Sequence, residues 1–496
     1  MRSVPSVPSI LLVGCGPHAR RIYLHQLALL GHALDVVVDL ESCRALVERH
    51  CPAATFIAVP DDERDLETLS SPVSASLDAV LTRREAPGDW RAIISTEPKA
   101  HLAYLRYFAA RGVPALVDKP ITAPIDTLNS FTAVERIRGD FDELAHAVDQ
   151  EPSLIKVQCQ RRYHVGYQFI RGLLCDTVAE YGVPVSTMEV YHSDGMWNMP
   201  DEFLFRENHP YKYGYGKLFH SGYHFVDLAA WLLEANDALP PERAADEFLL
   251  QVSSVTPDDL RAVITDEQFA RLFQRGAPSW PADSMHHFGE LDLFATAQFR
   301  RNARVLTTLS LVLTQTGFSR RAWPSLPPDT YKGNGRVRHE RLNIHVGPLL
   351  NVQLHSYQAV EIADRDVVDE WSPGGVEHFD IHVFRNTGLI GGPAHETIPL
   401  SALTSRQDSE FQGYNEEARM NCLREFLEPG VVGASDLNRH RDSIELTYAL
   451  YHQLACARLG LPTAPSFAWR RALAPTISPL LGQSLQGDQI RAHRPL

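Results

Sequence analysis

Short apolar runs alternate with amphipathic stretches along roughly the first 160 residues. The runs are typical of buried parallel strands, and the stretches between them have the spacing of helices that cover such a sheet. The predicted strands are 10–13, 34–38, 55–59, 92–95, 115–117 and 154–159, and the predicted helices are 19–30, 99–111 and 125–150. This alternation predicts an α/β fold with a doubly wound parallel sheet in an N-terminal domain, residues 1–160.

The pattern changes after residue 160. Alternating apolar and polar positions predict a larger, mostly antiparallel open sheet that two helices close, so we expect a second α/β domain over residues 161–463. Its predicted strands are 187–191, 249–255, 291–299, 305–314, 351–357 and 378–384, and its helices are 415–427 and 443–459. Two segments rich in Pro, Asp and Arg, 236–287 and 318–342, are interpreted as insertions, and residues 464–496 as a tail.

Composition narrows the classes of function. Hydrophobic residues make up 44% of the chain and charged residues 22%, and no apolar run reaches the roughly 18 residues that span a bilayer. The net charge of −14, without a basic tract, disfavours nucleic-acid binding. The seven scattered cysteines lack CxxC spacing, and residues 1–9 lack the features of a secretory signal. We therefore expect a cytoplasmic protein with reduced thiols and neither a nucleic-acid nor a membrane partner.

The first predicted strand ends in a glycine motif that fits G-x-G-x-x-G/A. Gly14 permits a tight turn, Gly16 lets the backbone approach a pyrophosphate, and the small Ala19 lets helix and strand pack closely. Asp39 ends the second strand, where an acid binds ribose hydroxyls and repels a 2′-phosphate, so NAD is favoured over NADP. The expected cofactor residues here are Gly14, Gly16, Pro17, His18, Ala19 and Asp39.

Four further segments follow in a recognisable order. They are residues 93–101 (IISTEPKAH), 115–122 (ALVDKPIT), 160–163 (QRRY) and 216–227 (GKLFHSGYHFVD). Together with the glycine motif they resemble the glucose-fructose oxidoreductase, inositol dehydrogenase and rhizopine-catabolism (Gfo/Idh/MocA) family over residues 10 to about 235. A looser likeness extends to the closing helices.

The resemblance implies an NAD(P)-dependent dehydrogenase or reductase that interconverts a secondary alcohol and a ketone on a sugar, cyclitol or sugar derivative. It implies a Rossmann domain and a second domain whose open sheet mediates oligomers, here a homodimer or homotetramer. By resemblance Lys119 stabilises the oxyanion and His224 relays the proton, while Asp227 either orients His224 or packs at the domain interface. The cofactor residues that the resemblance adds are Thr96, Glu97, Pro98, His101, Asp118 and Lys119.

The chain departs from the family pattern at His220, where the sugar and inositol dehydrogenases carry an Asp. Imidazole can donate as well as accept, so we expect an altered substrate, including one that bears a carboxylate or phosphate, or loss of ordinary dehydrogenase activity. His220 and His224 could form half of a metal site, but clustering is ordinary among 22 histidines and we expect no metal. The expected substrate-side residues are Arg161, Arg162, Tyr163, Tyr211 and Lys217.

Lys119 draws attention for a second reason: only six of the 47 basic residues are Lys, and Lys can lose its proton where Arg cannot. Two other functions stay open at this point. The same residues could oxidise a sugar transiently to promote elimination, as in NAD-dependent glycosidases. Alternatively the chain could bind NAD(P) as a sensor or interaction protein without catalysis, which the His220 exchange, the insertions and the tail all allow.

Overall fold

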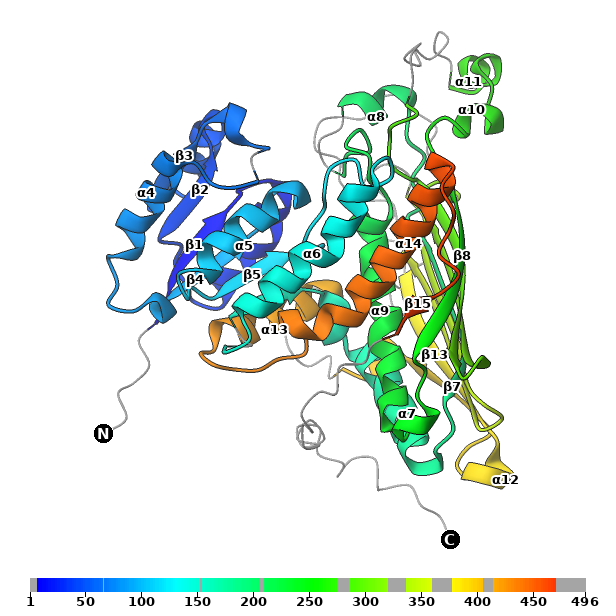
Figure 1. The fold of residues 1–496 in the computed structure, drawn as a ribbon. Coiled ribbons are helices and arrows are strands. Elements are labelled where there is room, and N and C mark those ends of the chain that lie inside the picture. The colour runs from blue at the N-terminus through cyan, green and yellow to red at the C-terminus, as the bar shows by residue number, and fades with distance from the viewer. Residues whose placement is uncertain are drawn as a thin grey trace, which may run out of the picture.

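Two sheets organise the chain into two lobes (Figure 1). The computed structural model describes residues 7–65, 67–151, 154–205, 209–273, 285–319, 336–358, 377–404 and 414–469. The first lobe contains the N-terminal sheet, and the second contains a larger sheet that lies beyond helices α6 and α14 in Figure 1.

The first sheet has six parallel strands in the order β3-β2-β1-β4-β5-β6. The strands are β1 (Ser9–Val13), β2 (Val36–Leu40), β3 (Thr55–Val59), β4 (Trp90–Ile94), β5 (Ala115–Asp118) and β6 (Ile155–Gln158). The strand order reverses between β1 and β4, and in such sheets ligands bind beyond the carboxyl ends of the strands at that point. The predicted Rossmann sheet is confirmed.

Helices on both faces of this sheet bury its apolar strands. The first runs from α1 (Pro17–Ala19) through a π-wound turn (Arg20–Leu24) into α2 (His25–Leu29). The others are α3 (Arg44–His50), α4 (Ser71–Leu81), α5 (His101–Ala109) and α6 (Phe131–Ala147). Helix α6 begins later than the predicted residue 125 because the Ser130 side chain accepts the Ala133 N–H and caps it there.

The second sheet has nine strands in the order β14-β13-β12-β11-β7-β10-β9-β8-β15, antiparallel except for the pair β7–β10. They are β7 (Val185–Ser193), β8 (Glu247–Val255), β9 (Asp292–Arg301), β10 (Arg304–Thr314), β11 (Arg338–Val346), β12 (Leu350–Gln358), β13 (Glu377–Arg385), β14 (His395–Pro399) and β15 (Phe467–Ala468). The predicted open, mostly antiparallel sheet is confirmed.

Both predicted insertions overlap strands of this sheet. The segment 236–287 contains β8, followed by α10 (Leu260–Val263) and α11 (Asp266–Phe273), while 318–342 runs into β11 beside the central strand β7. The buried Leu342, Ile344 and Val346 alternate with polar residues, as expected of a strand. The first half of β11 hides the strand, because it is polar throughout and its buried position is Glu340. The predicted tail begins with β15, which pairs with β8; residues 470–496 lie outside the described residues.

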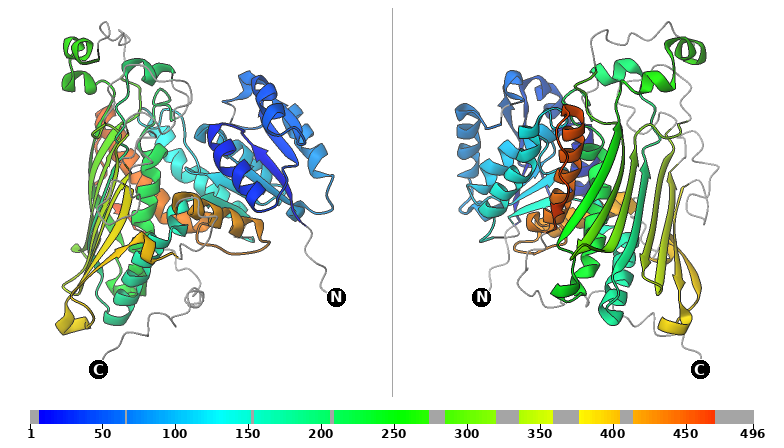
Figure 2. Two further views of the ribbon diagram at one scale, coloured as in Figure 1. Left: turned by 180° about the vertical axis from the view of Figure 1, so that it is seen from behind. Right: turned by 45° about the vertical axis from the view of Figure 1, so that its right-hand side comes forward.

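Helices cover the face of the second sheet that is turned toward the first lobe, as both views of Figure 2 show. They include α7 (Val165–Tyr181), α9 (Tyr223–Leu233) and α14 (Arg441–Leu459); the shorter α8 (Pro200–Phe205) and α12 (Thr387–Ile390) lie at the ends of the lobe. Helix α13 (Tyr414–Leu427) instead packs on the first lobe, where Cys422, Leu423 and Phe426 join a buried cluster with Ile10 and Leu12. The C-terminal part of the chain therefore completes the core of the N-terminal lobe.

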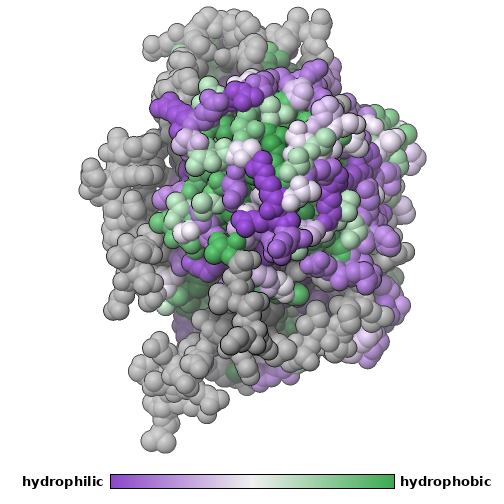
Figure 3. Space-filling model, turned by 90° about the vertical axis from the view of Figure 1, so that its left-hand side faces the viewer, coloured by the Kyte–Doolittle hydropathy of each residue, from purple (hydrophilic) through white to green (hydrophobic). Residues whose placement is uncertain are grey.

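Across the described ranges, none of the helices combines the length and apolar character needed to cross a bilayer. Hydrophilic and hydrophobic residues are interspersed over the face of the molecule shown in Figure 3.

Candidate functional site

A cleft of about 1090 Å³ opens where the sequence places its motifs. The carboxyl ends of β1, β2, β4 and β5 form one wall, and residues of the second lobe form the other. Of the predicted site residues, the cleft is lined by Gly14, Gly16, Pro17, His18, Asp39, Thr96, Glu97, Pro98, Asp118, Lys119, His220 and His224. One cavity therefore joins the glycine turn to the predicted catalytic pair.

The two motif glycines are needed for different reasons. Gly14 has φ +84°, and a Cβ there would lie 2.6 Å from the carbonyl oxygen of Ser95. Gly16 has an ordinary φ of −66°, and a Cβ there would meet nothing within 4 Å. Since neither the backbone nor packing explains Gly16, the open space beside it suits a ligand that approaches the main chain. Ala19 is buried between helix and sheet, as expected of the third position.

Asp39 lies across the turn from the glycines. Its Oδ2 accepts the Cys15 N–H at 2.7 Å, and its Oδ1 accepts the Leu40 N–H at 2.8 Å. The carboxylate therefore fixes the turn while it faces the cleft. Arg44, the nearby cation that could have attracted a 2′-phosphate, binds Glu41 through two hydrogen bonds and does not line the cleft.

His101 lies behind the wall of the cleft. Its ring is fully buried and its nitrogens lie 2.8 Å from the Pro120 carbonyl and 3.1 Å from the Thr96 carbonyl. It therefore ties the loop after β4 to the loop after β5. Asp118, the last residue of β5, accepts a hydrogen bond from the Tyr23 hydroxyl and, at 2.6 Å, one from the Ser95 hydroxyl.

Lys119 reaches across the cleft to the second lobe. Its Nζ donates to the carbonyl oxygen of His220 at 2.7 Å. That carbonyl is available because the helix is broken at His220, where φ is −82° and ψ is −121°. Burial in the cleft lowers the pKa of Lys119 to about 8, even though the neighbouring Asp118 charge opposes this shift.

His224 is the second titratable group of the cleft wall. Burial, and then the positive charges of Lys119, Arg161 and Arg419, hold its pKa well below the usual range. The imidazole is therefore neutral at neutral pH. Its Nδ1 makes no hydrogen bond to any of the residues described here.

The ring of His220 is enclosed by other rings. The centroids of His209 and Tyr211 lie 5.0 Å from that of His220, and that of Tyr215 lies 5.9 Å away, all in edge-on geometry. Tyr211 does not itself line the cleft, so it supports His220 rather than facing a ligand. His220, which stands where the family pattern has an Asp, is therefore part of a cluster of edge-on aromatic rings.

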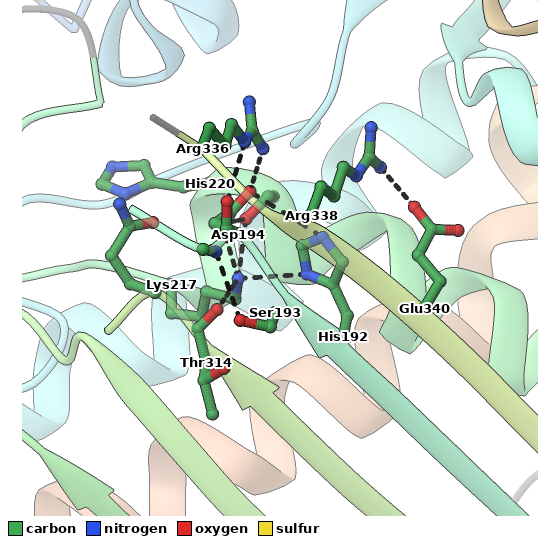
Figure 4. A network of polar contacts seen from close by, with 12 residues as sticks. His192, Ser193, Asp194, Lys217, His220, Thr314, Arg336, Arg338 and Glu340 are labelled. Carbon is green, nitrogen blue, oxygen red and sulfur yellow. Dashed lines mark hydrogen bonds and ion pairs between the residues drawn. The ribbon is translucent and has the colours of Figure 1, made fainter. Parts of the chain in front are cut away.

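Lys217 lies below the cleft floor. Its Nζ, fully buried, donates to Asp194 at 2.6 Å, to the Thr314 carbonyl at 2.9 Å and to Ser221 at 3.0 Å. Arg336 binds Asp194 from the other side, as Figure 4 shows. Lys217, a predicted substrate residue, does not itself line the cleft, but two of the groups that it binds, Asp194 and Ser221, do.

Asp227 does not bind His224. It forms a fully buried ion pair with Arg162, whose Nε and Nη2 donate to its two oxygens at 3.0 and 2.7 Å. His440 and Ser443 also approach Oδ1, at 3.0 and 2.7 Å. Of the two alternatives for Asp227, these contacts support packing between segments and not orientation of the imidazole.

Two more predicted substrate residues lie outside the cleft lining. Arg161 is buried, donates to Glu340 at 2.6 Å and lies over the ring of Phe225. The hydroxyl of Tyr163 donates to Glu425. Among the described residues, one cluster of three ligand-type side chains could hold a metal, Cys159, Asp227 and His440, and its carboxylate already binds the Arg162 guanidinium. His220 and His224 are not part of it.

Sequence reasoning missed part of the cleft wall. These residues are Gln158, Gln160, Asp194, His209, Arg336, Arg338, Asn415 and Arg419. Asp194 directly follows β7, and a polar residue at a strand end is a signal that could have been used. No local pattern marks Arg419, because only the packing of α13 on the first lobe brings it to the site.

Glu290 supports the segment that carries Lys217 and His220. A Cβ on Gly216 would lie 2.0 Å from the Glu290 carbonyl oxygen, and a Cβ on Gly289 would lie 2.0 Å from the Tyr215 carbonyl, so both glycines permit close backbone contact. The Glu290 carboxyl accepts from the Leu218 N–H at 2.8 Å and from the Tyr451 hydroxyl at 3.0 Å. Its Oε2 has no hydrogen-bond partner within the described ranges, and burial raises its pKa to about 7.

No protein-family model matches this sequence, and no curated protein matches it. Solved structures match its fold. An oxidoreductase from Agrobacterium radiobacter, in complex with NAD+, L-tartaric acid and magnesium, has a TM-score of 0.55 and 12% identity, over 93% of this chain and 98% of that one. This chain shares the fold of that structure.

Two further solved structures also match the fold of this chain. A dehydrogenase from Chromobacterium violaceum has a TM-score of 0.51 and 13% identity, over 91% of this chain and 96% of its own. A 3-ketoreductase from Actinomadura kijaniata, in complex with NADP and TDP-benzene, has a TM-score of 0.50 and 10% identity, over 89% and 96%. At such identities, what these proteins share with this chain is the combination of a Rossmann sheet with a larger open sheet.

The buried pair gives a first prediction. Asp227→Asn leaves the Arg162 guanidinium buried without its counter-charge, so we expect it to lower the free energy of unfolding by about 3–5 kcal/mol. Urea denaturation followed by circular dichroism measures this. Glu41→Gln, which breaks the exposed pair with Arg44, is the matched control and should change stability little. Equal stability of Asp227→Asn and wild type would contradict a structural role for the pair.

A second prediction concerns pH. The pKa of Glu290 is raised, so the native state holds a proton that the unfolded chain releases, and stability is lost as pH rises from about 4.5 to about 7. Glu290→Gln does not titrate and keeps an acceptor for the Leu218 N–H. Its stability relative to wild type should therefore grow by on the order of 2 kcal/mol between about pH 5 and pH 8. If thermal melts show that the stability difference between Glu290→Gln and wild type does not change with pH, the raised pKa of Glu290 is refuted.

Proposed function

We propose that this protein is an NAD(P)-dependent oxidoreductase that interconverts a secondary alcohol and a ketone on a sugar-like or cyclitol-like substrate. One observation carries the proposal. A single cleft joins the glycine turn at Gly14 and Gly16, where a dinucleotide would bind, to Lys119 and His224, which can serve a reacting hydroxyl. The resemblance of the motifs to the Gfo/Idh/MocA family and the shared oxidoreductase fold support the same conclusion.

The residues of the cleft fit a dinucleotide. Gly16 leaves space that neither packing nor backbone conformation requires, at the start of the helix that begins at Pro17. Backbone N–H groups and the helix dipole at such a start favour a pyrophosphate. Asp39 would bind the ribose hydroxyls, and its charge together with the pairing of Arg44 to Glu41 favours NAD over NADP. When bound, the nicotinamide would accept or return the hydride.

Lys119 and His224 would divide the acid–base work. A group with a pKa of about 8 exchanges protons readily near neutral pH, whereas a buried imidazole surrounded by cations holds a proton poorly. We therefore assign to Lys119 the proton transfer that the sequence suggested for His224. In oxidation the neutral amine of Lys119 takes the hydroxyl proton as the carbon loses hydride. His224, neutral, accepts a hydrogen bond from a substrate hydroxyl through Nδ1 and orients it.

The substrate class rests on the lining of the cleft and on the neighbours in fold. The complexes named above contain L-tartaric acid in one case and TDP-benzene in another. Both ligands are anionic, and one is a small hydroxylated acid. Together with Lys119, Arg336, Arg338 and Arg419 in the cleft wall, they support a hydroxylated small molecule, including anionic ones, as substrate.

A third prediction tests the role of Lys119. Lys119→Met should lower kcat by about 10²–10⁴-fold because the acid–base group is lost, while the Kd for NADH changes little. For wild type, kcat/KM in the oxidising direction should rise with pH and level off above about 8, since the neutral amine is the active form. Turnover is followed by nicotinamide absorbance with a panel of sugars, cyclitols and sugar acids. Lys212→Met is the matched control on the neighbouring loop.

These measurements test the proposed function and the role of Lys119 separately. If wild type binds neither NADH nor NADPH, the proposed function is wrong. If nucleotide binds but Lys119→Met keeps full turnover with the same pH profile, only the role of Lys119 is wrong.

A fourth prediction concerns cofactor preference. Asp39→Asn keeps an oxygen for the Cys15 N–H but removes the charge that would repel a 2′-phosphate. The ratio of NADPH to NADH affinity should therefore rise by about 10-fold, as measured by fluorescence titration of both nucleotides. An unchanged ratio would show that Asp39 only fixes the turn.

A further inference from the structure

Arg419 reaches the cleft from the far end of the chain. It lies on α13 next to Ala418, which is buried in the cluster that joins this helix to the first lobe. The helix is also held by hydrogen bonds: Gln158 Nε2 donates to the Arg419 carbonyl at 3.3 Å, and Gln26 Nε2 donates to the Glu416 carbonyl at 2.8 Å. The backbone that carries the Arg419 side chain is therefore fixed on the Rossmann lobe.

The side chain of Arg419 is largely desolvated and keeps unused donors. Only 13% of it is exposed, although it lines the cleft. Its Nη1 donates to Glu416 at 3.1 Å, and the same carboxylate also accepts from Arg21 at 3.4 Å. One carboxylate therefore serves two guanidinium groups. The Nε and Nη2 of Arg419 make no hydrogen bond to any residue in the described part of the chain.

Elsewhere in this chain the same two atoms bind carboxylates. The Nε and Nη2 of Arg44, Arg106, Arg111 and Arg162 each donate to both oxygens of one carboxylate. This side-on fork is the strongest arrangement that Arg offers to a planar or tetrahedral oxyanion. In Arg419 the fork lies beside the cleft, and none of the residues that the structure describes accepts a hydrogen bond from it.

Arg419 lies close to the groups proposed to serve the reacting hydroxyl. Its charge contributes to the lowered pKa values of both Lys119 and His224. It acts in the same way on His18 beside the glycine turn, and it shares the Glu416 carboxylate with Arg21 of the helix that starts there. An anion held by the fork of Arg419 would therefore lie between the glycine turn and the pair Lys119 and His224.

We propose that Arg419 binds an oxyanion of the substrate, a carboxylate or a phosphate ester, beside the hydroxyl that Lys119 and His224 serve. The substrate is accordingly a sugar acid or a sugar phosphate, and neutral sugars bind weakly. This inference rests on the proposed function, because it takes the nucleotide to occupy the glycine turn. Arg419 determines specificity and takes no part in proton transfer.

The test compares binding of a neutral probe with that of two anionic probes. Wild type, Arg419→Gln and Arg419→Lys are first titrated with NADH, and the NADH complexes are then titrated with D-glucose, D-glucuronate and D-glucose 6-phosphate while nicotinamide fluorescence is followed. Arg424→Gln is the matched control, because Arg424 lies on the same helix, is exposed and binds Asn421. The two anionic probes distinguish a carboxylate from a phosphate ester.

We expect wild type and Arg424→Gln to bind one anionic probe at least about 10-fold more tightly than D-glucose. Arg419→Gln should lose this preference with an unchanged Kd for NADH, and Arg419→Lys should keep part of it, since it retains the charge without the fork. The inference is overturned if wild type shows no preference for either anion, or if Arg419→Gln retains it. It is also overturned if Arg419→Gln loses NADH affinity instead, because the fork then serves the nucleotide. Failure of wild type to bind NADH or NADPH would instead overturn the proposed function itself, and this inference with it.

Discussion

The hydrogen bond from Lys119 to the main-chain carbonyl of His220 joins the two lobes at the site. Both ends of this bond depend on structure elsewhere. Lys119 is carried by the loop after β5, which His101 ties to the loop after β4. The carbonyl faces the cleft only because the helix that leads into α9 is broken at His220. A main-chain acceptor holds Lys119 without adding a negative charge, so the amine keeps the lowered pKa that burial gives it.

Close contacts hold the helix break at His220 in one conformation. Gly216 and Gly289 let two chain segments meet at backbone distance, and the Glu290 carboxyl binds the Leu218 N–H. Lys217 holds the same turn through its bond to Asp194 (Figure 4) and through a bond to Ser221. These groups hold in place the residues that line the cleft. This explains why residues with functional character in the sequence, such as Lys217 and Asp227, lie behind the cleft and not in it.

Sequence patterns predicted what local rules control. The Rossmann strands, Gly14, Gly16 and Asp39 follow from periodicity and from a turn whose geometry demands particular residues, and the structure places them as expected. The roles of charged residues were harder to predict. In the sequence, Arg162 and Arg161 cannot be told from cations that face a ligand, because the acids that they bind, Asp227 and Glu340, lie 65 and 179 residues further along the chain. Strand β11 was missed because its first half is polar throughout, with Glu340 at a buried position. Arg419 depends on a long-range docking that no local pattern encodes.

Helix α13 has a consequence for how this protein is made. The core of the first lobe includes Cys422, Leu423 and Phe426, yet its own strands end near residue 158. During synthesis, the N-terminal lobe therefore emerges from the ribosome long before the helix that completes it. Until α13 has been made, the apolar surface beside Ile10 and Leu12 stays exposed. Domains usually fold in turn as they are translated. Here the first lobe to be translated cannot complete this part of its core until nearly the whole chain has been made.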